Sequence, residues 1–205
     1  KTLMSAMGVS VLFVGVSGAL SQMLHAEGGA LTVQGTMMMI LSLAVGAVLG
    51  ELLDLEDRME RFGAWLKVKT KSESDGGFIG AFVTASLTVC IGAMAIVGSI
   101  QDGILGDHAT LFAKAVLDLV IIMVMTASMG KGCIFSAIPV GILQGSVTLL
   151  ARLLQPVFTD AALSNLSLVG SVLVFCVGLN LVWGKKIRVA NLLPSLLIAV
   201  IWAFL

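Results

Sequence analysis

The chain has 205 residues, of which 58% are hydrophobic and only 12% are charged, and its mean hydropathy is +1.07. A soluble domain needs more charge on its water-facing surface, so this composition excludes an ordinary soluble protein and indicates a polytopic membrane protein. The formal net charge is zero, which gives no basis for predicting a nucleic-acid partner.

Continuous apolar runs predict an all-α transmembrane bundle with seven spans. A helix needs about 20 residues to cross a hydrocarbon core of about 30 Å, whereas barrel strands would alternate over about 10 residues. We interpret residues 1–205 as one transmembrane domain. The predicted spans are 3–24, 35–53, 78–100, 110–129, 133–154, 162–183 and 188–205.

Lys and Arg residues alternate between successive connectors and so predict the orientation of the spans. Connector 54–77 carries five of them, and Lys131 and the sequence KKIR mark the connectors before spans five and seven. Connectors 25–34, 101–109 and 155–161 carry none. Cytoplasmic loops are rich in Lys and Arg, so the basic connectors are predicted to be cytoplasmic and the C-terminus extracytoplasmic. Arg152, near the outer end of its span, is the exception and is expected to snorkel.

Residues 52–77 predict a cytoplasmic amphipathic helix and a flexible loop. The helix, 52–66, is expected to continue the second span, with an apolar stripe at Leu52, Leu55, Met59, Phe62 and Leu66. Such a helix suits the membrane interface or the rim of a bundle. Docking of a partner protein is the alternative to this structural role. The following sequence KVKTKSESDGG is typical of a flexible loop.

Small residues seven positions apart recur in three spans, which suggests internal repeats. The sequences LFVGV, VCIGA and FCVGL contain Gly15, Gly92 and Gly178, and another small residue stands seven positions before each glycine: Gly8, Ala85 and Ser171. Spans two to four would then match spans five to seven, and an odd number of spans in each unit makes the copies inverted, as in many secondary transporters. Ordinary small-residue packing is the alternative.

Prolines in two spans predict interrupted helices. Pro139 lies early in span five and Pro194 lies within span seven. Each proline removes one backbone hydrogen bond, and the freed carbonyl must be satisfied by protein or by water in a cavity. The alternative is a kink that only shapes helix packing.

Lys114 and Asp118 lie four residues apart inside an apolar span, with Asp118 about 12 Å from the start of the helix. A charge at the centre of a membrane helix costs about 2.5–3.5 kcal/mol and so indicates a functional site by default. A structural ion pair is the alternative, although base before acid is the weaker order, and the lysine could also snorkel outward.

Intramembrane amides need external partners and are therefore candidates to share the cavity of this pair. The predicted substrate-binding set is Lys114, Asp118, Gln144, Asn180 and Asn191, with Thr84, Ser86 and Thr88 as weaker candidates because hydroxyls often bond their own helix. Asp102 and Asp107, beside His108, are predicted to flank an outer entrance. Solvated loop residues are the alternative for these two aspartates.

Enzyme chemistry is not expected. The three cysteines lie in apolar segments without metal-binding spacing, and no protease, hydrolase, nucleotide-binding or dinucleotide-binding motif is present. The sequence therefore predicts no catalytic residues, no metal and no cofactor.

Several stretches resemble the YqgA-like family of bacterial inner-membrane proteins of unknown function, whose members are sometimes described as permeases or transporters. The resemblance covers essentially the whole chain, and its most specific parts are GSIQDG…GD…LFAK…LD and RVANLLP. It implies a bacterial inner-membrane location and, because family members carry one more apolar segment upstream, an eighth span. It implies no catalytic residue.

These observations predict a transporter that moves a small solute or ion through a polar intramembrane cavity. The alternative is a structural or signalling membrane protein that docks a partner through 52–66. The lipid bilayer and the solute are the expected partners, and a homo-oligomer is compatible with the sequence.

Overall fold

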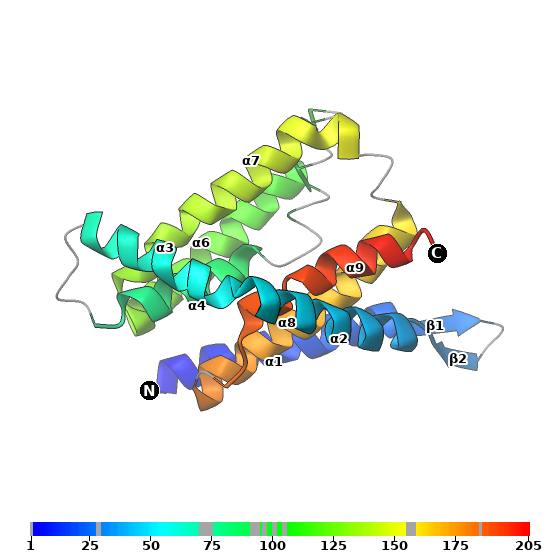
Figure 1. The fold of residues 1–205 in the computed structure, drawn as a ribbon, viewed down its shortest axis with the longest axis horizontal. Helices are drawn as coiled ribbons and strands as arrows, with labels where there is room; N and C mark the ends of the chain where they lie inside the picture. The colour runs from blue at the N-terminus through cyan, green and yellow to red at the C-terminus, as the bar shows by residue number, and fades with distance from the viewer. Residues whose placement is uncertain are drawn as a thin grey trace. The chain divides into compact units, whose positions relative to one another are not determined.

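The computed structural model describes residues 2–27, 30–69, 76–90, 95, 98–99, 102–103, 106–154, 159–184 and 186–205. Helices dominate this part of the chain (Figure 1). The α-helices are α1 (Thr2–Met23), α2 (Thr36–Leu53), α3 (Leu55–Lys69), α4 (Phe78–Cys90), α6 (Ala109–Met129), α7 (Ala137–Leu154), α8 (Asp160–Trp183) and α9 (Pro194–Trp202). The 3-10 helices are η1 (Lys131–Ser136) and η2 (Val189–Leu192).

One connector departs from the all-α expectation. Strands β1 (Leu24–Glu27) and β2 (Ala30–Val33) form an antiparallel hairpin, in which Leu24 pairs with Val33.

The predicted spans coincide with apolar helices. Within the described residues, four helical runs are long and apolar enough to cross a membrane: Thr36–Leu53, Ala109–Met129, Lys131–Ala151 and Asp160–Trp183. Three shorter apolar helices, Gly8–Met23, Phe78–Cys90 and Val189–Trp202, fall on the other predicted spans. The count of seven spans therefore stays a prediction, and part of span three, including Gly92, lies outside the described residues.

The chain packs as two compact units. The central unit comprises residues 1–7 and 56–155, and the terminal unit comprises residues 8–55 and 156–205. The single transmembrane domain predicted from the sequence, and the inverted repeats within it, stay predictions.

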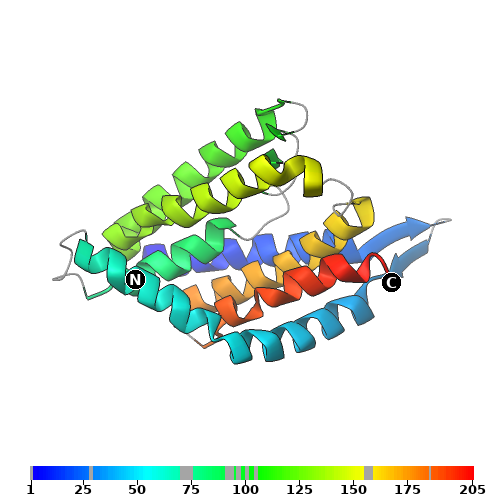
Figure 2. The same cartoon turned by 45° about the horizontal axis from the view of Figure 1, so that its top comes forward.

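Helices of the terminal unit pack through small residues. A Cβ added at Gly178 of α8 would come 2.7 Å from the Leu12 backbone nitrogen of α1, and one added at Gly50 of α2 would come 1.7 Å from the Asn191 carbonyl oxygen of η2. α8 lies between α1 and α9, and α2 lies on the other side of α9 (Figure 2). These contacts are the close backbone approaches that small residues permit in membrane bundles.

In the central unit, α4 packs against α3, α6 and η1. Its Ala81 and Ala85 form an apolar core with Met125 of α6 and Cys133 of η1. On the other side, Phe82 of α4 lies 5.8 Å, between ring centroids, from Phe62 of α3. The small residues Ala81 and Ala85 of α4 bring α6 and η1 close to it, whereas Phe82 makes the contact with α3.

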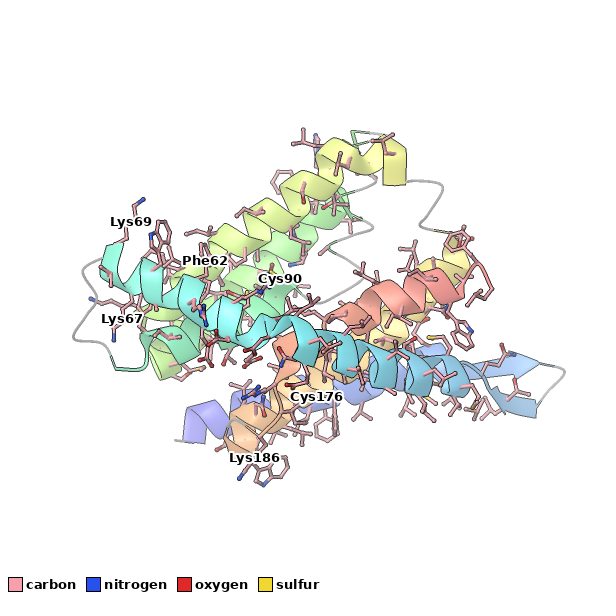
Figure 3. The ribbon with its side chains drawn as sticks, viewed as in Figure 1. Phe62, Lys67, Lys69, Cys90, Cys176 and Lys186 are labelled. Atoms are coloured by element: carbon pink, nitrogen blue, oxygen red, sulfur yellow. The ribbon has the colours of Figure 1, made fainter. Side chains whose placement is uncertain are left out.

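The amphipathic helix is present, but it does not continue the second span without a break. α2 ends at Leu53, and Asp54 takes a left-handed conformation with φ 47° before α3 begins. Leu66 is buried on the inner face of α3, whereas Leu52 at the end of α2 is 77% exposed. Trp65 is exposed with Lys69 Nζ 4.7 Å from its ring centroid, and Figure 3 shows Lys67 and Lys69 at that end of α3.

Both prolines lie in the first turn of an α-helix, directly after a 3-10 helix. Pro139 is the third residue of α7 and follows η1, and Pro194 is the first residue of α9 and follows η2. The first-turn N–H groups have no partner within an α-helix, so a proline there sacrifices no bond. The interruption predicted at the prolines is therefore a change of helix type just before them. Gly130 and Gly184, both with positive φ, precede the two 3-10 segments.

Candidate functional site

Lys114 and Asp118 form an ion pair on the inner side of α6. Lys114 Nζ contacts Asp118 Oδ2 and also donates a hydrogen bond of 2.9 Å to the Val89 carbonyl oxygen of α4. Lys114 is 6% exposed, so the lysine does not snorkel. The mutual pair expected as one alternative is therefore formed, with a backbone oxygen as a third member.

A cavity of about 350 Å³ opens beside Asp118 within the central unit. Asp118, Gln144 of α7 and Ser136 of η1 all contribute to its wall. The structure therefore brings Asp118 and Gln144, which the sequence grouped only by residue type, to one cavity. Its walls are otherwise apolar. The lining residues are Val89, Ala115, Asp118, Leu119, Ile122, Ile134, Ser136, Ala137, Val140, Gly141 and Gln144.

The turn of the chain at Gly130 places these polar groups on facing elements. α6 ends at Met129, η1 returns against α4, and α7 runs on from it, so Asp118 and Gln144 come from helices joined by one short connection. Ser136 is 2% exposed at the end of η1. Asp118 keeps its side chain 22% exposed, which leaves the carboxylate accessible from the cavity.

Hydroxyl groups of α4 and α6 show two different behaviours. Thr88 donates a hydrogen bond of 2.8 Å to the Thr84 carbonyl oxygen, which fits the expectation that such residues bond their own helix. Ser86 Oγ and Thr126 Oγ1 are buried and have no hydrogen-bond partner within the described residues. Sequence reasoning gave no weight to Thr126, because a single hydroxyl in an apolar span carries no signal of its own.

Cys90, at the C-terminal end of α4, is a further neighbour of the pair. It lies within electrostatic reach of both Lys114 and Asp118, and Figure 3 shows it on the α4 side of the central unit. In the sequence, Cys90 is only one of three cysteines that lie in apolar segments. Its neighbourhood follows from the Val89 hydrogen bond, which brings this end of α4 to Lys114.

Asn180 lies in the terminal unit and organises a loop. Its Oδ1 accepts hydrogen bonds from the backbone N–H groups of Lys186 (2.9 Å) and Ile187 (3.0 Å), and its Nδ2 donates to the Ile187 carbonyl oxygen (2.7 Å). These three bonds engage both the oxygen and the nitrogen of the Asn180 amide. The structure therefore gives Asn180 a role in holding the loop between α8 and η2.

Asn191 lines a second cavity, of about 420 Å³, within the terminal unit. The residue is 1% exposed, and the cavity wall also includes Glu51 of α2 and Arg188. Arg188 Nη1 lies 3.4 Å from Glu51 Oε2 and 3.9 Å from Asp54 Oδ1, which are long, exposed ion pairs of small energetic weight. The five predicted binding residues thus divide between the two units.

Asp102 and Asp107 lie near the N-terminal end of α6, away from the lining of the Asp118 cavity. Asp102 contacts His108 Nδ1, and Asp107 Oδ1 accepts a hydrogen bond of 3.0 Å from the Ala109 N–H. The Asp107 bond is a local contact of the Asx-turn type just before α6, whose N-cap residue is His108. Nine residues, or about 13 Å along the helix, separate Ala109 from Asp118.

The outer surfaces of these helices are apolar. On α6, Phe112, Val116 and Val120 are each more than half exposed, while the charged pair faces inward. A hydrocarbon solvent demands apolar side chains on the outside of a protein and charged groups on the inside. Together with the apolar helices of spanning length, this arrangement defines a helical membrane protein.

The chain belongs to the family described as protein of unknown function (DUF554), whose model matches residues 1–204. It is 31% identical over 196 residues to the uncharacterized membrane protein YdfK of Bacillus subtilis, covering 96% of this chain and 80% of that protein. It is 30% identical over 165 residues to the uncharacterized protein YqgA of Escherichia coli, covering 78% of this chain and 70% of that protein. The resemblance to YqgA-like proteins is thereby confirmed. No solved structure matches the chain.

Proposed function

We propose that this membrane protein is a transporter that moves a small solute or ion through the cavity beside Asp118. The observation that carries the proposal is the joint lining of one cavity by Asp118 and Gln144, two polar side chains from different apolar helices. Intramembrane charge is costly, so a carboxylate that remains accessible to a cavity needs a reason beyond packing.

The cavity has the make-up of a small-ligand site. It is mostly apolar, and a few polar groups of fixed orientation converge on it, which is the usual composition of such sites. Its volume of about 350 Å³ suits a solute of a few heavy atoms or a partly hydrated ion. Asp118 supplies a negative charge, and Gln144 supplies both a donor and an acceptor. We infer no enzymatic step and no cofactor.

The alternative function, docking of a partner through 52–66, has less support. The apolar stripe of this segment needs to be free for a partner, but Leu66 is buried and Phe62 packs on Phe82 within the central unit. The exposed Trp65 fits a helix at the membrane interface, where indole rings concentrate.

We place the protein in the bacterial inner membrane, with the basic connectors on the cytoplasmic side and the C-terminus outside. The family resemblance supports the location, and the alternation of Lys and Arg supports the orientation. The bilayer and the transported solute are the partners that this proposal requires, and a homo-oligomer is compatible with it.

The proposal is tested by a ligand screen followed by uptake measurements. Purified protein is melted in the presence of a panel of amino acids, organic acids, amines, sugars and inorganic salts, and every stabilising compound is assayed for uptake into proteoliposomes. We expect at least one compound that raises the Tm of the wild type, fails to raise that of Asp118→Asn, and enters wild-type proteoliposomes faster than protein-free ones.

Two matched controls separate the cavity from the rest of the chain. Asp57→Asn removes a carboxylate from the exposed Asp57–Arg61 pair of α3 and should leave uptake unchanged. Gly141→Leu should block uptake, because Gly141 lines the cavity and an added Cβ meets no atom within 4 Å. Gly145→Leu, one turn further along α7 and equally open, should not block it. Equal uptake by Asp118→Asn, Asp57→Asn, Gly141→Leu and Gly145→Leu would contradict the proposal.

A further inference from the structure

The Lys114 ammonium group sits where a bound cation would sit. Two oxygen atoms from different helices hold it, a carboxylate oxygen of Asp118 on α6 and the carbonyl oxygen of Val89 on α4, the latter at 2.9 Å. Both oxygens belong to residues that line the cavity. Val89 belongs to α4, and its carbonyl oxygen accepts the Lys114 hydrogen bond across the two helices.

The charge of the site selects a monovalent ion. Asp118 is the one carboxylate among the lining residues, and no group of three or more His, Cys, Asp or Glu side chains that could hold a metal occurs in the part of the chain described. Calcium and magnesium sites in proteins usually combine several carboxylates or a substrate phosphate. One carboxylate with neutral carbonyl and hydroxyl oxygens balances a single positive charge.

Further oxygen donors stand at the same cavity. Ser136 of η1 and Gln144 of α7 line the same cavity as Asp118, so its wall carries a hydroxyl and an amide oxygen besides the carboxylate. Lys114 engages Asp118 Oδ2, and the Asp118 side chain is 22% exposed. The carboxylate is therefore accessible to a ligand in the cavity.

We propose that the oxygens of Asp118 and Val89 form a binding site for a small monovalent cation, which Lys114 occupies as a built-in competitor. The inference rests on the proposed function, because it names the class of ligand that the transport cavity accepts. A cation that enters the cavity takes the place of the Lys114 ammonium on Asp118. An alkali metal ion and a small primary ammonium share this chemistry, since both carry one positive charge and both bind oxygen.

The test removes the competitor and measures binding of the bare ions. Lys114→Met keeps an unbranched side chain and removes the charge. Purified variants are melted in NaCl, KCl or methylammonium chloride, with N-methyl-D-glucamine chloride at equal ionic strength as the reference. For Lys114→Met we expect a rise in Tm of roughly 5–10 °C at a hundredfold excess of the bound ion over its Kd. A rise with Na⁺ or K⁺ assigns an alkali ion, and a rise with methylammonium alone assigns an amine.

Wild type should show the same rise only at higher concentrations of the ion, because the lysine competes. The double variant Lys114→Met/Asp118→Asn should show no rise above the reference salt. Equal melting of Lys114→Met in all four salts would overturn the inference, as would an undiminished rise in the double variant. Failure to recover Lys114→Met from membranes in any of the salts would also overturn it, because a bound cation should neutralise Asp118.

This experiment separates the inference from the proposed function. Uptake that depends on Asp118 without any cation-specific stabilisation of Lys114→Met would remove the cation site and leave the transporter. Specific stabilisation without Asp118-dependent uptake of any compound would leave the cation site and remove the transporter.

Discussion

Lys114 Nζ donates a hydrogen bond of 2.9 Å to the Val89 carbonyl oxygen, which ties α6 to the last turn of α4. This bond explains why the lysine stays inside the unit with 6% exposure when a flexible side chain of its length could reach toward the membrane surface. It also makes Lys114 part of a network with Asp118 and the Val89 carbonyl oxygen. Removal of either charge from this network leaves the other charge without its partner.

The Lys114–Asp118 pair should show a large coupling energy in a double-mutant cycle. In a buffer whose cation is N-methyl-D-glucamine, Lys114→Met should lower the free energy of unfolding by about 3 kcal/mol, because it leaves a buried carboxylate unpaired. Asp118→Asn should cost less, since Lys114 keeps its hydrogen bond to the Val89 carbonyl oxygen. The double variant should recover most of the loss, with a coupling energy of about 2–3 kcal/mol.

The exposed Asp57–Arg61 pair is the matched cycle, because it has the same four-residue spacing with an N–O distance of 2.5 Å. Its side chains are 42% and 80% exposed, so its coupling energy should stay below about 1 kcal/mol. Equal coupling in the two cycles would contradict the buried network. Recovery of uptake together with stability in the Lys114→Met/Asp118→Asn protein would show that the pair serves the fold alone.

Gly50→Ala should destabilise the terminal unit strongly. Its new Cβ would come 1.7 Å from the Asn191 carbonyl oxygen, a contact that only a shift of α2 or η2 relieves. We expect a loss of about 3 kcal/mol, at the upper end for an overpacked core, measured by thermal unfolding in detergent. Gly145→Ala is the control, because its Cβ meets no atom within 4 Å. It should gain about 0.5–1 kcal/mol from helix propensity, and an equal loss in both variants would contradict the packing described here.

Asn180→Ala should release the loop between α8 and η2. It removes three hydrogen bonds to Lys186 and Ile187, so trypsin should cleave after Lys186 several times faster than in the wild type, and the Tm should fall. The expected cost is roughly 1–3 kcal/mol. Asn165→Ala on the same helix removes one bond, of 3.2 Å to Ala199, and should leave the loop protected. Unchanged cleavage in Asn180→Ala would show that other contacts hold the loop.

The orientation is tested by thiol labelling in a cysteine-free background. Lys69→Cys, at the end of α3, should react with a membrane-impermeant reagent in inside-out vesicles. His108→Cys, before α6, should react in right-side-out cells, because its connector has no Lys or Arg. Labelling of both positions from the same side would contradict the predicted topology.

Much of the fold could be predicted because membrane helices are recognisable in a sequence by their length and hydropathy. The apolar runs located every described α-helix of spanning length, and the charged pair pointed to α6. The break at Asp54 was missed because a left-handed residue between two helical patterns leaves no gap in hydrophobic periodicity. The 3-10 helices before Pro139 and Pro194 were missed for a similar reason, since the residues that form them also suit an α-helix.

The candidate site could be predicted only by residue type. Lys114, Asp118 and Gln144 stood out because charge and amide groups are expensive in lipid, and the structure joins Asp118 and Gln144 at one cavity. The same argument selected Asn180, whose amide is instead used by loop backbone only six and seven residues away. The sequence does not show which group an isolated polar residue bonds to. Residue type alone therefore cannot distinguish a residue that holds a loop from one that lines a cavity.

The central claim, that a path open to water reaches Asp118, is tested most directly by the reactivity of a cysteine at Gly141. Gly141→Cys places a thiol in the cavity wall, and Val116→Cys places one at the depth of Asp118 on the outer, apolar side of α6. In a cysteine-free background, Gly141→Cys should react with a membrane-impermeant methanethiosulfonate from one side of the membrane, at least tenfold faster than Val116→Cys. Equally slow reaction at both positions, from both sides, would show a closed and dry bundle and would contradict the account.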